Sequence, residues 1–130
     1  MKHNILKSIV YLYYLSIFIL LIIYLFPGSI IGYLLYADLG KQPNFVNTPV
    51  GTSINHFFYF FYLTFLGTIY NLNKKKFINS FLFLCILSLI LEFLHLFIPN
   101  RAFELNDLLA NFLGVVSVFF LFKLIKKFIT

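Results

Sequence analysis

Four long apolar runs separated by short polar segments dominate the chain. They cover residues about 8–26, 54–72, 77–98 and 105–125, and each is close to the ~20 residues that a helix needs to cross a bilayer. Pro27 and Gly28 follow the first run and Pro99 follows the third, and both residue types end helices. The pattern predicts an all-α membrane protein, with residues 1–130 forming one domain that is a bundle of four transmembrane helices.

The segment 27–53 between the first two runs is mixed. Residues 30–36 are apolar but too short to span a bilayer, which indicates an interfacial or re-entrant helical turn. Residues 38–51 are rich in Gly, Pro and Asn, which are typical of loops. Two interpretations stay open for this outer loop: a surface connector, or a lid over a binding site.

Composition changes the picture in two ways. With 62% hydrophobic and 11% charged residues, a soluble domain of this length would have to expose much of its apolar surface to water. The net charge of +6 would suggest a nucleic-acid partner in a soluble protein, but here the basic residues stand in short clusters between apolar runs, which is how membrane topology is encoded. We therefore expect the lipid bilayer as the surroundings and no nucleic acid as a partner. The sequence leaves the oligomeric state open.

The basic residues also predict the orientation. With four spans, the N-terminus, the turn at 74–76 and the C-terminus share one side of the membrane, and that side holds eight of the ten Lys and Arg residues. Only Lys41 and Arg101 fall on the other face. The positive-inside rule then places both termini in the cytoplasm, in a multi-pass protein of the cell membrane. The carboxylates fall on or near the outer face: Asp38, Glu92, Glu104 and Asp107.

Polar residues of the third run lie on one helix face near its outer end. A charged side chain inside the hydrocarbon costs about 2.5–3.5 kcal/mol, so it is rarely present without a partner or a role. Glu92 and His95 are three residues apart and share a helix face. Ser88 and Cys85 extend that face toward the middle of the run. The spacing predicts a seam that faces other helices.

The fourth run has a matching face. Asp107, Asn111 and Gly114 follow an i, i+4, i+7 spacing, and Ala110 with Gly114 forms a small-xxx-small pair of the kind that lets two membrane helices approach closely. His56 begins the second run on the same side of the membrane. Since a buried polar group needs a partner, we predict one shared, outward-facing polar pocket lined by His56, Glu92, His95, Arg101, Asp107 and Asn111.

The residue types suggest roles in this pocket. Glu92 and His95 could act as a catalytic acid/base pair, whereas the Arg101 guanidinium suits phosphate or carboxylate. Structural alternatives stay open for each residue. Asp107 could cap the first turn of its helix or be favoured by the helix dipole, and Asn111 with Gly114 could serve packing and hydrogen bonding between helices. Glu92 and His95 could be a buried structural pair, His56 could be an interfacial histidine, and Arg101 could form an internal salt bridge. The E-x-x-H spacing lacks the second histidine of H-E-x-x-H, so we expect no metal and no cofactor.

The motif resembles that of the VanZ-like membrane protein family, which reads E-x-x-Q/H, then P-x-R, then D-x-x-x-N-x-x-G. It stands here as Glu92, His95, Pro99, Arg101, Asp107, Asn111 and Gly114. The resemblance covers essentially the whole chain. One departure is that family members often carry Asp-Lys three to four residues before the histidine of the second helix, where this chain has Thr52 and Ser53.

The resemblance implies a role in the cell envelope at the outer leaflet, because the family is named for a protein associated with resistance to teicoplanin-type lipoglycopeptides. It implies no particular reaction. We expect a protein that recognises an envelope lipid or glycan head group and so modulates envelope properties or glycopeptide-type antibiotic susceptibility. Two alternatives are a membrane-embedded transferase or hydrolase that acts on that head group, and an assembly partner of a larger membrane complex.

Overall fold

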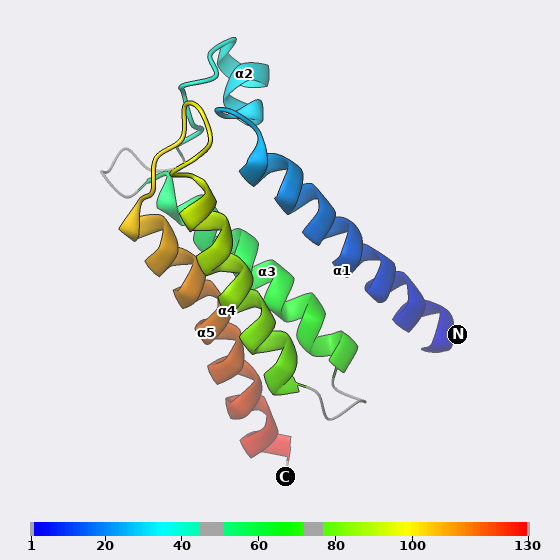
Figure 1. Ribbon diagram of the computed structural model, residues 1–130. Helices are drawn as coiled ribbons and strands as arrows, with labels where there is room; N and C mark the ends of the chain where they lie inside the picture. The colour runs from blue at the N-terminus through cyan, green and yellow to red at the C-terminus, as the bar shows by residue number, and fades with distance from the viewer. Residues whose placement is uncertain (1, 45–50, 72–76, 130) are drawn as a thin grey trace.

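The computed structural model describes residues 2–44, 51–71 and 77–129, and every regular element in this part of the chain is a helix. This confirms the all-α prediction. The helices, shown in Figure 1, are α1 (Lys2–Leu25), α2 (Ile30–Tyr36), α3 (Ser53–Asn71), α4 (Phe77–Leu94) and α5 (Leu105–Ile129).

Helices α3, α4 and α5 pack side by side, with the most extensive contact between α3 and α5, and α1 lies alongside this group against α3 (Figure 1). The N-terminus of α1 and the C-terminus of α5 lie at one end of the bundle, which we call the terminal end. At the opposite end are α2, the start of α3 and residues 95–104, and we call this the loop end. The predicted site residues lie in the loop-end halves of α3, α4 and α5 or, for His95 and Arg101, in residues 95–104 at the same end.

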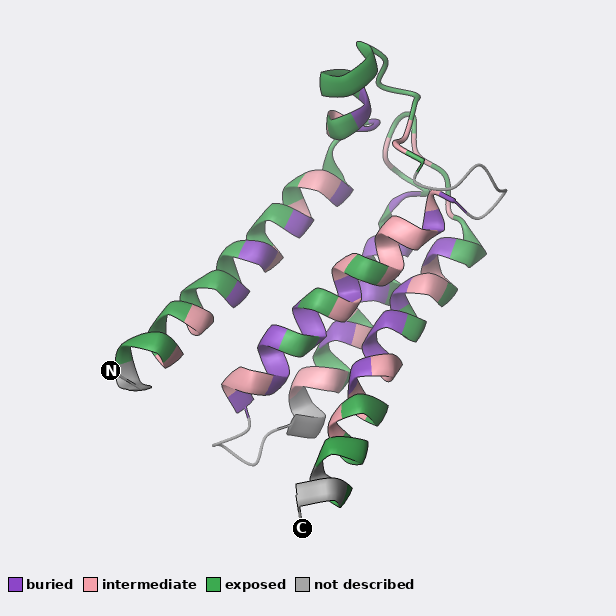
Figure 2. Cartoon of the chain, turned by 180° about the vertical axis from the view of Figure 1, so that it is seen from behind, coloured by how far each residue is buried: buried purple, intermediate pink, exposed green. Residues whose placement is uncertain are grey.

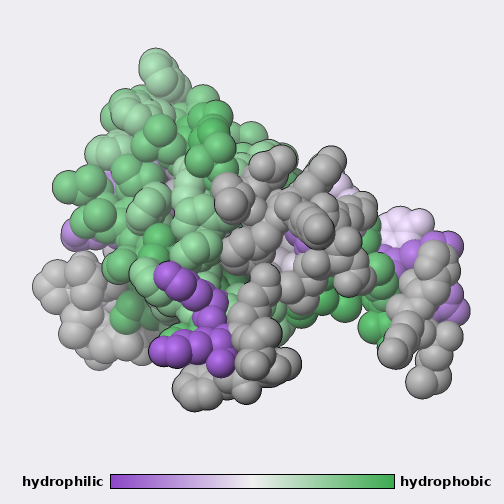
Figure 3. Space-filling model, turned by 90° about the horizontal axis from the view of Figure 1, so that it is seen from below, coloured by the Kyte–Doolittle hydropathy of each residue, from purple (hydrophilic) through white to green (hydrophobic). Residues whose placement is uncertain are grey.

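Two helices are long and apolar enough to cross a membrane, over Asn4–Leu25 in α1 and Leu105–Ile125 in α5, while the apolar part of α4 is shorter (Ser80–Leu94). The outward faces carry large exposed apolar side chains, among them Phe18, Phe83 and Leu113. Figure 2 shows the exposed residues along the outer side of α1, and Figure 3 shows hydrophobic residues over much of the surface seen from the terminal end. Such extended apolar surface is typical of contact with a membrane.

Helix boundaries differ in detail from the predicted ones. The first helix begins earlier than residue 8 and ends at Leu25, and the last continues past residue 125 to Ile129. The third predicted helix, about 77–98, was too long, because α4 ends at Leu94. Residues 95–97 form a tighter turn in which each N–H donates to the carbonyl three residues before it, at 2.9–3.2 Å. Pro99 accounts for this, because the backbone before a proline avoids the helical region.

The segment 27–53 contains α2, so the prediction of a helical turn at 30–36 is confirmed, and the described residues form five helices in all. Ser29 caps α2: its Oγ accepts from the Gly32 N–H at 2.9 Å. Gly28 has a φ of +91°, and a Cβ there would lie 2.7 Å from the Leu39 carbonyl oxygen. Only glycine fits this close return of the chain. The choice between connector and lid stays open, and residues 45–50 lie outside the described part.

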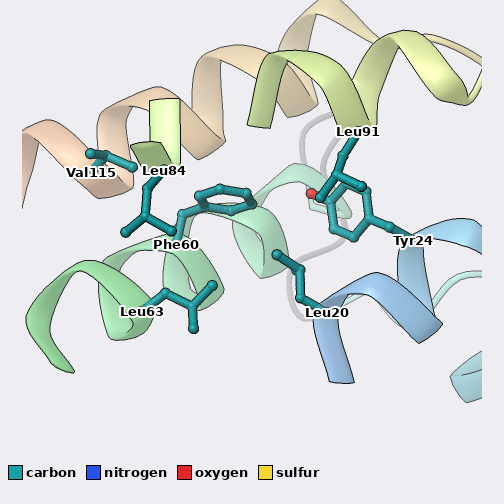
Figure 4. Packing of buried hydrophobic residues seen from close by; sticks show 7 residues of the cluster. All are labelled: Leu20, Tyr24, Phe60, Leu63, Leu84, Leu91 and Val115. Carbon is teal, nitrogen blue, oxygen red and sulfur yellow. The ribbon is translucent and has the colours of Figure 1, made fainter. Parts of the chain in front are cut away.

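The core of the bundle is a set of buried apolar side chains from four helices, shown in Figure 4: Leu20 and Tyr24 of α1, Phe60 and Leu63 of α3, Leu84 and Leu91 of α4, and Val115 of α5. Phe60 is fully buried at its centre, with its ring centroid 6.4 Å from that of Tyr24. In a bilayer the lipid tails are as apolar as these side chains, so close packing rather than water exclusion holds such helices together.

Gly114 sets the distance between α3 and α5. A Cβ at this position would lie 2.4 Å from the Phe57 carbonyl oxygen and 2.9 Å from the Phe61 nitrogen, both backbone atoms that cannot move aside. The close helix approach that the small-residue spacing predicts is therefore present, at Gly114 and against α3.

We predict that Gly114→Ala destabilises the protein by about 1–3 kcal/mol, the range for overpacking, because α3 and α5 must move apart. Helix propensity alone would favour alanine by about 1 kcal/mol. A loss of stability would therefore show that the added Cβ is overpacked against α3. Reversible unfolding in detergent micelles measures it. Gly40→Ala is the control, because its Cβ would meet only the Asp38 carboxylate at 3.4 Å. Stabilisation by Gly114→Ala would contradict the close approach.

Candidate functional site

A set of polar side chains lies at the loop end, between the four long helices. We call it the polar cluster, and each member comes from a position where its helix faces the others. All but His56, whose side chain is 10% exposed, belong to buried residues. The members are Tyr24 of α1, Ser53 and His56 of α3, Glu92 and His95 at the end of α4, and Asp107 and Asn111 of α5.

Asp107 joins α5 to α3 through both of its carboxylate oxygens. Oδ1 accepts from the Ser53 hydroxyl at 2.5 Å, and Oδ2 lies 3.3 Å from Nε2 of His56. Asp107 also stands in the first turn of α5, where the helix dipole favours negative charge. Ser53 and His56 are three residues apart, so one face of α3 presents both partners to the same carboxylate.

Tyr24 extends this arrangement to α1. Its hydroxyl lies 2.6 Å from Nδ1 of His56 and 3.1 Å from Oδ1 of Asn111. Its ring stacks on that of His95, with the centroids 5.2 Å apart. Polar contacts therefore run from Ser53 through Asp107 and His56 to Tyr24 and link three helices, with a hydrogen bond at each end and the 3.3 Å contact between Asp107 and His56 in the middle.

Glu92 and His95 form a second pair that anchors the end of α4. Oε1 of Glu92 accepts from the Glu104 backbone N–H at 3.0 Å, at the start of α5, and lies 3.4 Å from Nδ1 of His95. Nε2 of His95 donates to the Tyr24 carbonyl at 3.2 Å. Both imidazole nitrogens thus lie against oxygen atoms, one of a side chain and one of the backbone.

Arg101 and His95 together cap the C-terminus of α1. The last carbonyls of a helix have no partner within it. Here Nη2 of Arg101 donates to the Ile23 carbonyl at 2.9 Å, and Nε lies 3.5 Å from the carbonyl oxygen of Phe26. Nε2 of His95 donates to the Tyr24 carbonyl. Positive groups at this end also interact favourably with the helix dipole.

Arg101 makes these backbone contacts and forms no ion pair with Glu92, Glu104 or Asp107, the three acids nearest to it in the described part of the chain. Burial lowers the pKa of the guanidinium, while the carboxylates of Glu92 and Asp107 act in the opposite direction. An arginine keeps its charge under such conditions. It is therefore a fixed cation beside the polar cluster, and its remaining N–H groups are available to an anion.

Two atoms of the cluster are buried without a hydrogen-bond partner among the described residues: Oε2 of Glu92 and Nδ2 of Asn111. A buried polar atom left unpaired costs about 1–3 kcal/mol, and most such atoms in proteins are paired. The two are complementary, one an acceptor and one a donor. They are the two buried atoms of the cluster whose hydrogen-bonding capacity is unused.

The structure brings the predicted site residues together, with Arg101 at the edge. The cluster is closed rather than an open cleft, since Glu92 and Asn111 are 0% exposed and Asp107 is 4% exposed. In the described residues no group of three or more His, Cys, Asp or Glu side chains is arranged to hold a metal ion. Three of the seam residues, Ser88, Glu92 and His95, are buried as predicted, and Cys85 is half-buried.

Sequence reasoning missed Tyr24 and Ser53. Ser53 could have been found from its position three residues before His56, on the same helix face. Tyr24 gives no such signal, because it is one of several hydroxyl-bearing residues in an apolar helix. Only the packing of α1 against α3 and α4 brings its hydroxyl between His56 and Asn111.

Comparison with known proteins identifies the family of this chain. The family model described as VanZ/LLP1 matches residues 8–126. The chain belongs to the VanZ/LLP1 family. No curated protein and no solved structure matches the chain. Family membership confirms the resemblance based on the motif, and with the two long apolar helices it supports a membrane protein of the VanZ family. In this VanZ chain the departure at Ser53 supplies a hydroxyl to Asp107.

We predict that His56 and Asp107 are energetically coupled. Asp107→Ala should destabilise the protein by about 1–3 kcal/mol, because it leaves Ser53 and His56 without their acceptor. In the Asp107→Ala background His56→Ala should cost less than it does alone, with an interaction energy of about 0.5–3 kcal/mol. Unfolding of the two single variants and the double variant in detergent measures this coupling.

The control for this cycle is Asp38→Ala combined with His56→Ala. Asp38 is exposed, and within the described residues its Oδ1 accepts from the Gly40 N–H at 2.8 Å. The two changes should therefore be additive. Additivity of His56→Ala with Asp107→Ala as well would show that the contact between His56 and Asp107 does not hold α3 to α5.

Proposed function

We propose that this VanZ-family protein binds the anionic head group of an envelope lipid or glycan at the outer leaflet, with Arg101 as the contact for phosphate or carboxylate. By holding such head groups, it modulates envelope properties and the access of glycopeptide-type antibiotics. Asp107, Asn111 and His56 orient the head group. Glu92 and His95 are positioning residues, because their bonds hold the ends of α1, α4 and α5 together.

The proposal includes four spans with both termini in the cytoplasm of a cell membrane. The N-terminus of α1 and the C-terminus of α5 lie at the terminal end (Figure 1), and most of the basic residues in the described part of the chain belong to these two segments, including Lys7, Lys123 and Lys127. The basic turn at 74–76 lies outside the described residues. Under the positive-inside rule, this basic end faces the cytoplasm and the loop end with the polar cluster faces outward.

One observation carries the proposal: titratable side chains converge at a single end of an otherwise apolar bundle, next to a fixed arginine. His56, Glu92 and Asp107 come from three different helices and meet there. A bilayer makes each of these groups costly, so their gathering at one depth favours a shared role. Helix anchoring accounts for most of the contacts, but it leaves Oε2 of Glu92 and Nδ2 of Asn111 unused.

Arg101 suits head-group recognition better than the other cation on this face. Its guanidinium is held by the carbonyls of Ile23 and Phe26, so little side-chain freedom is lost when an anion binds. Lys41 is exposed and lies over the ring of Tyr36, 4.3 Å from its centroid. The planar guanidinium of Arg101, held in one orientation, favours bidentate contact with phosphate or carboxylate.

We predict that Arg101→Gln weakens the binding of an anionic head group about tenfold or more, the equivalent of one charge-assisted hydrogen bond. Native mass spectrometry of the purified protein in detergent, titrated with phosphatidylglycerol or phosphatidylcholine, measures the affinity. The soluble analogue glycerol 1-phosphate is a further arm that separates a free head group from a lipid.

Lys41→Gln is the matched control, because it removes one positive charge from the same face and should change binding less than twofold if it makes no direct contact. Equal binding of phosphatidylglycerol by the wild type and Arg101→Gln, at retained stability, would contradict head-group recognition through Arg101. A change in the mass of the bound lipid during incubation would replace the binding proposal with the enzyme alternative, since recognition leaves the ligand intact.

A further inference from the structure

A cavity of about 330 Å³ opens between α3 and α5, directly beside the polar cluster. Two polar residues stand at its loop end: Ser53, which donates to Asp107, and Asn106, the chain neighbour of Asp107. The rest of the lining is apolar and comes from the facing sides of the two helices: Ile54, Phe57, Leu109, Ala110 and Leu113. We call this cavity the α3–α5 groove.

The groove is closed toward the middle of the bundle. One turn beyond Ala110, Gly114 brings α5 against the backbone of Phe57 and Phe61, so the two helices leave no space between them there. Along α5 the lining extends from Asn106 to Leu113, a length of about 10 Å at 1.5 Å per residue. The groove is thus a short apolar channel with a polar end at the cluster and a closed end at Gly114.

We propose that the α3–α5 groove seats one acyl chain of the lipid whose head group the polar cluster binds, with Ser53 at the junction between head group and chain. This rests on the proposed function and narrows it, because it selects a lipid over a soluble glycan. The ligand class is an anionic lipid of the outer leaflet. Its head group lies toward Arg101, and its chain runs between α3 and α5.

The composition of the groove argues for an amphipathic occupant. A soluble glycan would place hydroxyl groups against Phe57, Leu109 and Leu113, where they would find no partners. A side chain from a neighbouring helix could pack against the apolar walls, but it would make no use of the polar groups of Ser53 and Asn106. An acyl chain matches the apolar walls, and the polar linkage between chain and head group matches the polar end.

A second groove in the same protein shows what non-specific lipid contact would look like. It lies between α4 and α5, has a similar volume of about 350 Å³, and is lined by Cys85, Ile86, Leu89, Leu108, Leu109 and Phe112. None of these residues belongs to the polar cluster. Lipid tails of the bilayer cover both grooves in any case. Specific seating therefore requires that occupancy of the α3–α5 groove by the anionic lipid depend on the polar cluster, and that occupancy of the α4–α5 groove not depend on it.

Photo-crosslinking tests this. The wild-type protein is placed in nanodiscs of phosphatidylcholine that contain a small fraction of phosphatidylglycerol with a diazirine on one acyl chain, and the labelled peptides are mapped by mass spectrometry. We expect labelling in the α3–α5 groove to exceed that in the α4–α5 groove several-fold. The excess should disappear when the diazirine lipid is phosphatidylcholine, which lacks net negative charge.

Two variants test the assignment. Ala110→Trp fills the α3–α5 groove and should abolish the excess labelling there. Cys85→Trp fills the α4–α5 groove and should leave the labelling of the α3–α5 groove unchanged. Arg101→Gln should also remove the excess, because the head group is no longer held. Ala110→Leu is a milder filling variant that keeps the test valid if tryptophan disturbs the fold.

Equal labelling of the two grooves, or an excess that persists in Arg101→Gln, would overturn the acyl-chain seat. Failure of the proposed function itself gives a different result. In that case Arg101→Gln binds phosphatidylglycerol as well as the wild type does in the titration. Loss of titrated binding in Arg101→Gln with equal labelling of the grooves would leave head-group recognition intact and remove only the acyl-chain seat.

Discussion

In a bundle that presents apolar side chains outward, a buried polar group must find its partner inside the protein. The C-terminus of α1 shows how far this constraint shapes the loop end. Its free carbonyls are reached by Arg101 from one loop and by His95 from the end of α4. His95 is held in turn by Glu92, which also accepts the N–H of Glu104 at the start of α5. One set of contacts thus fixes three helix ends.

This arrangement changes how the acidic and basic residues are interpreted. Glu92 and His95 look from sequence like a catalytic pair, yet their polar atoms mainly serve backbone groups and each other. Arg101 at the edge keeps N–H groups free for an anion, and the unpaired atoms among the buried members of the polar cluster are Oε2 of Glu92 and Nδ2 of Asn111. A ligand that approaches from the membrane surface would meet Arg101, because Glu92 and Asn111 are 0% exposed. Recognition therefore fits the geometry better than catalysis by the buried pair.

Much of the fold followed from the sequence. The helix faces that carry Glu92 with His95 and Asp107 with Asn111 could be predicted because a helix places residues three and four apart on one side. The contacts between helices could not be predicted, because they depend on how each helix is rotated and how deep it lies. The pairing of Asp107 with Ser53 and His56, and the place of Tyr24 between His56 and Asn111, belong to that class. The early end of α4 has a different reason, because Pro99 disfavours the helical backbone conformation in the residue before it.

Recognition of an outer-leaflet head group requires that the loop end face outward, and cysteine accessibility in intact cells measures this directly. Cys85 is the chain's one cysteine, so Cys85→Ala gives a background into which Phe97→Cys at the loop end and Lys127→Cys at the terminal end are introduced singly. Phe97 is 82% exposed, and Lys127 is exposed as well. We predict that a membrane-impermeant maleimide labels position 97 in intact cells and position 127 only after lysis. The reverse pattern would place the polar cluster at the cytoplasmic surface and contradict recognition of an outer-leaflet head group.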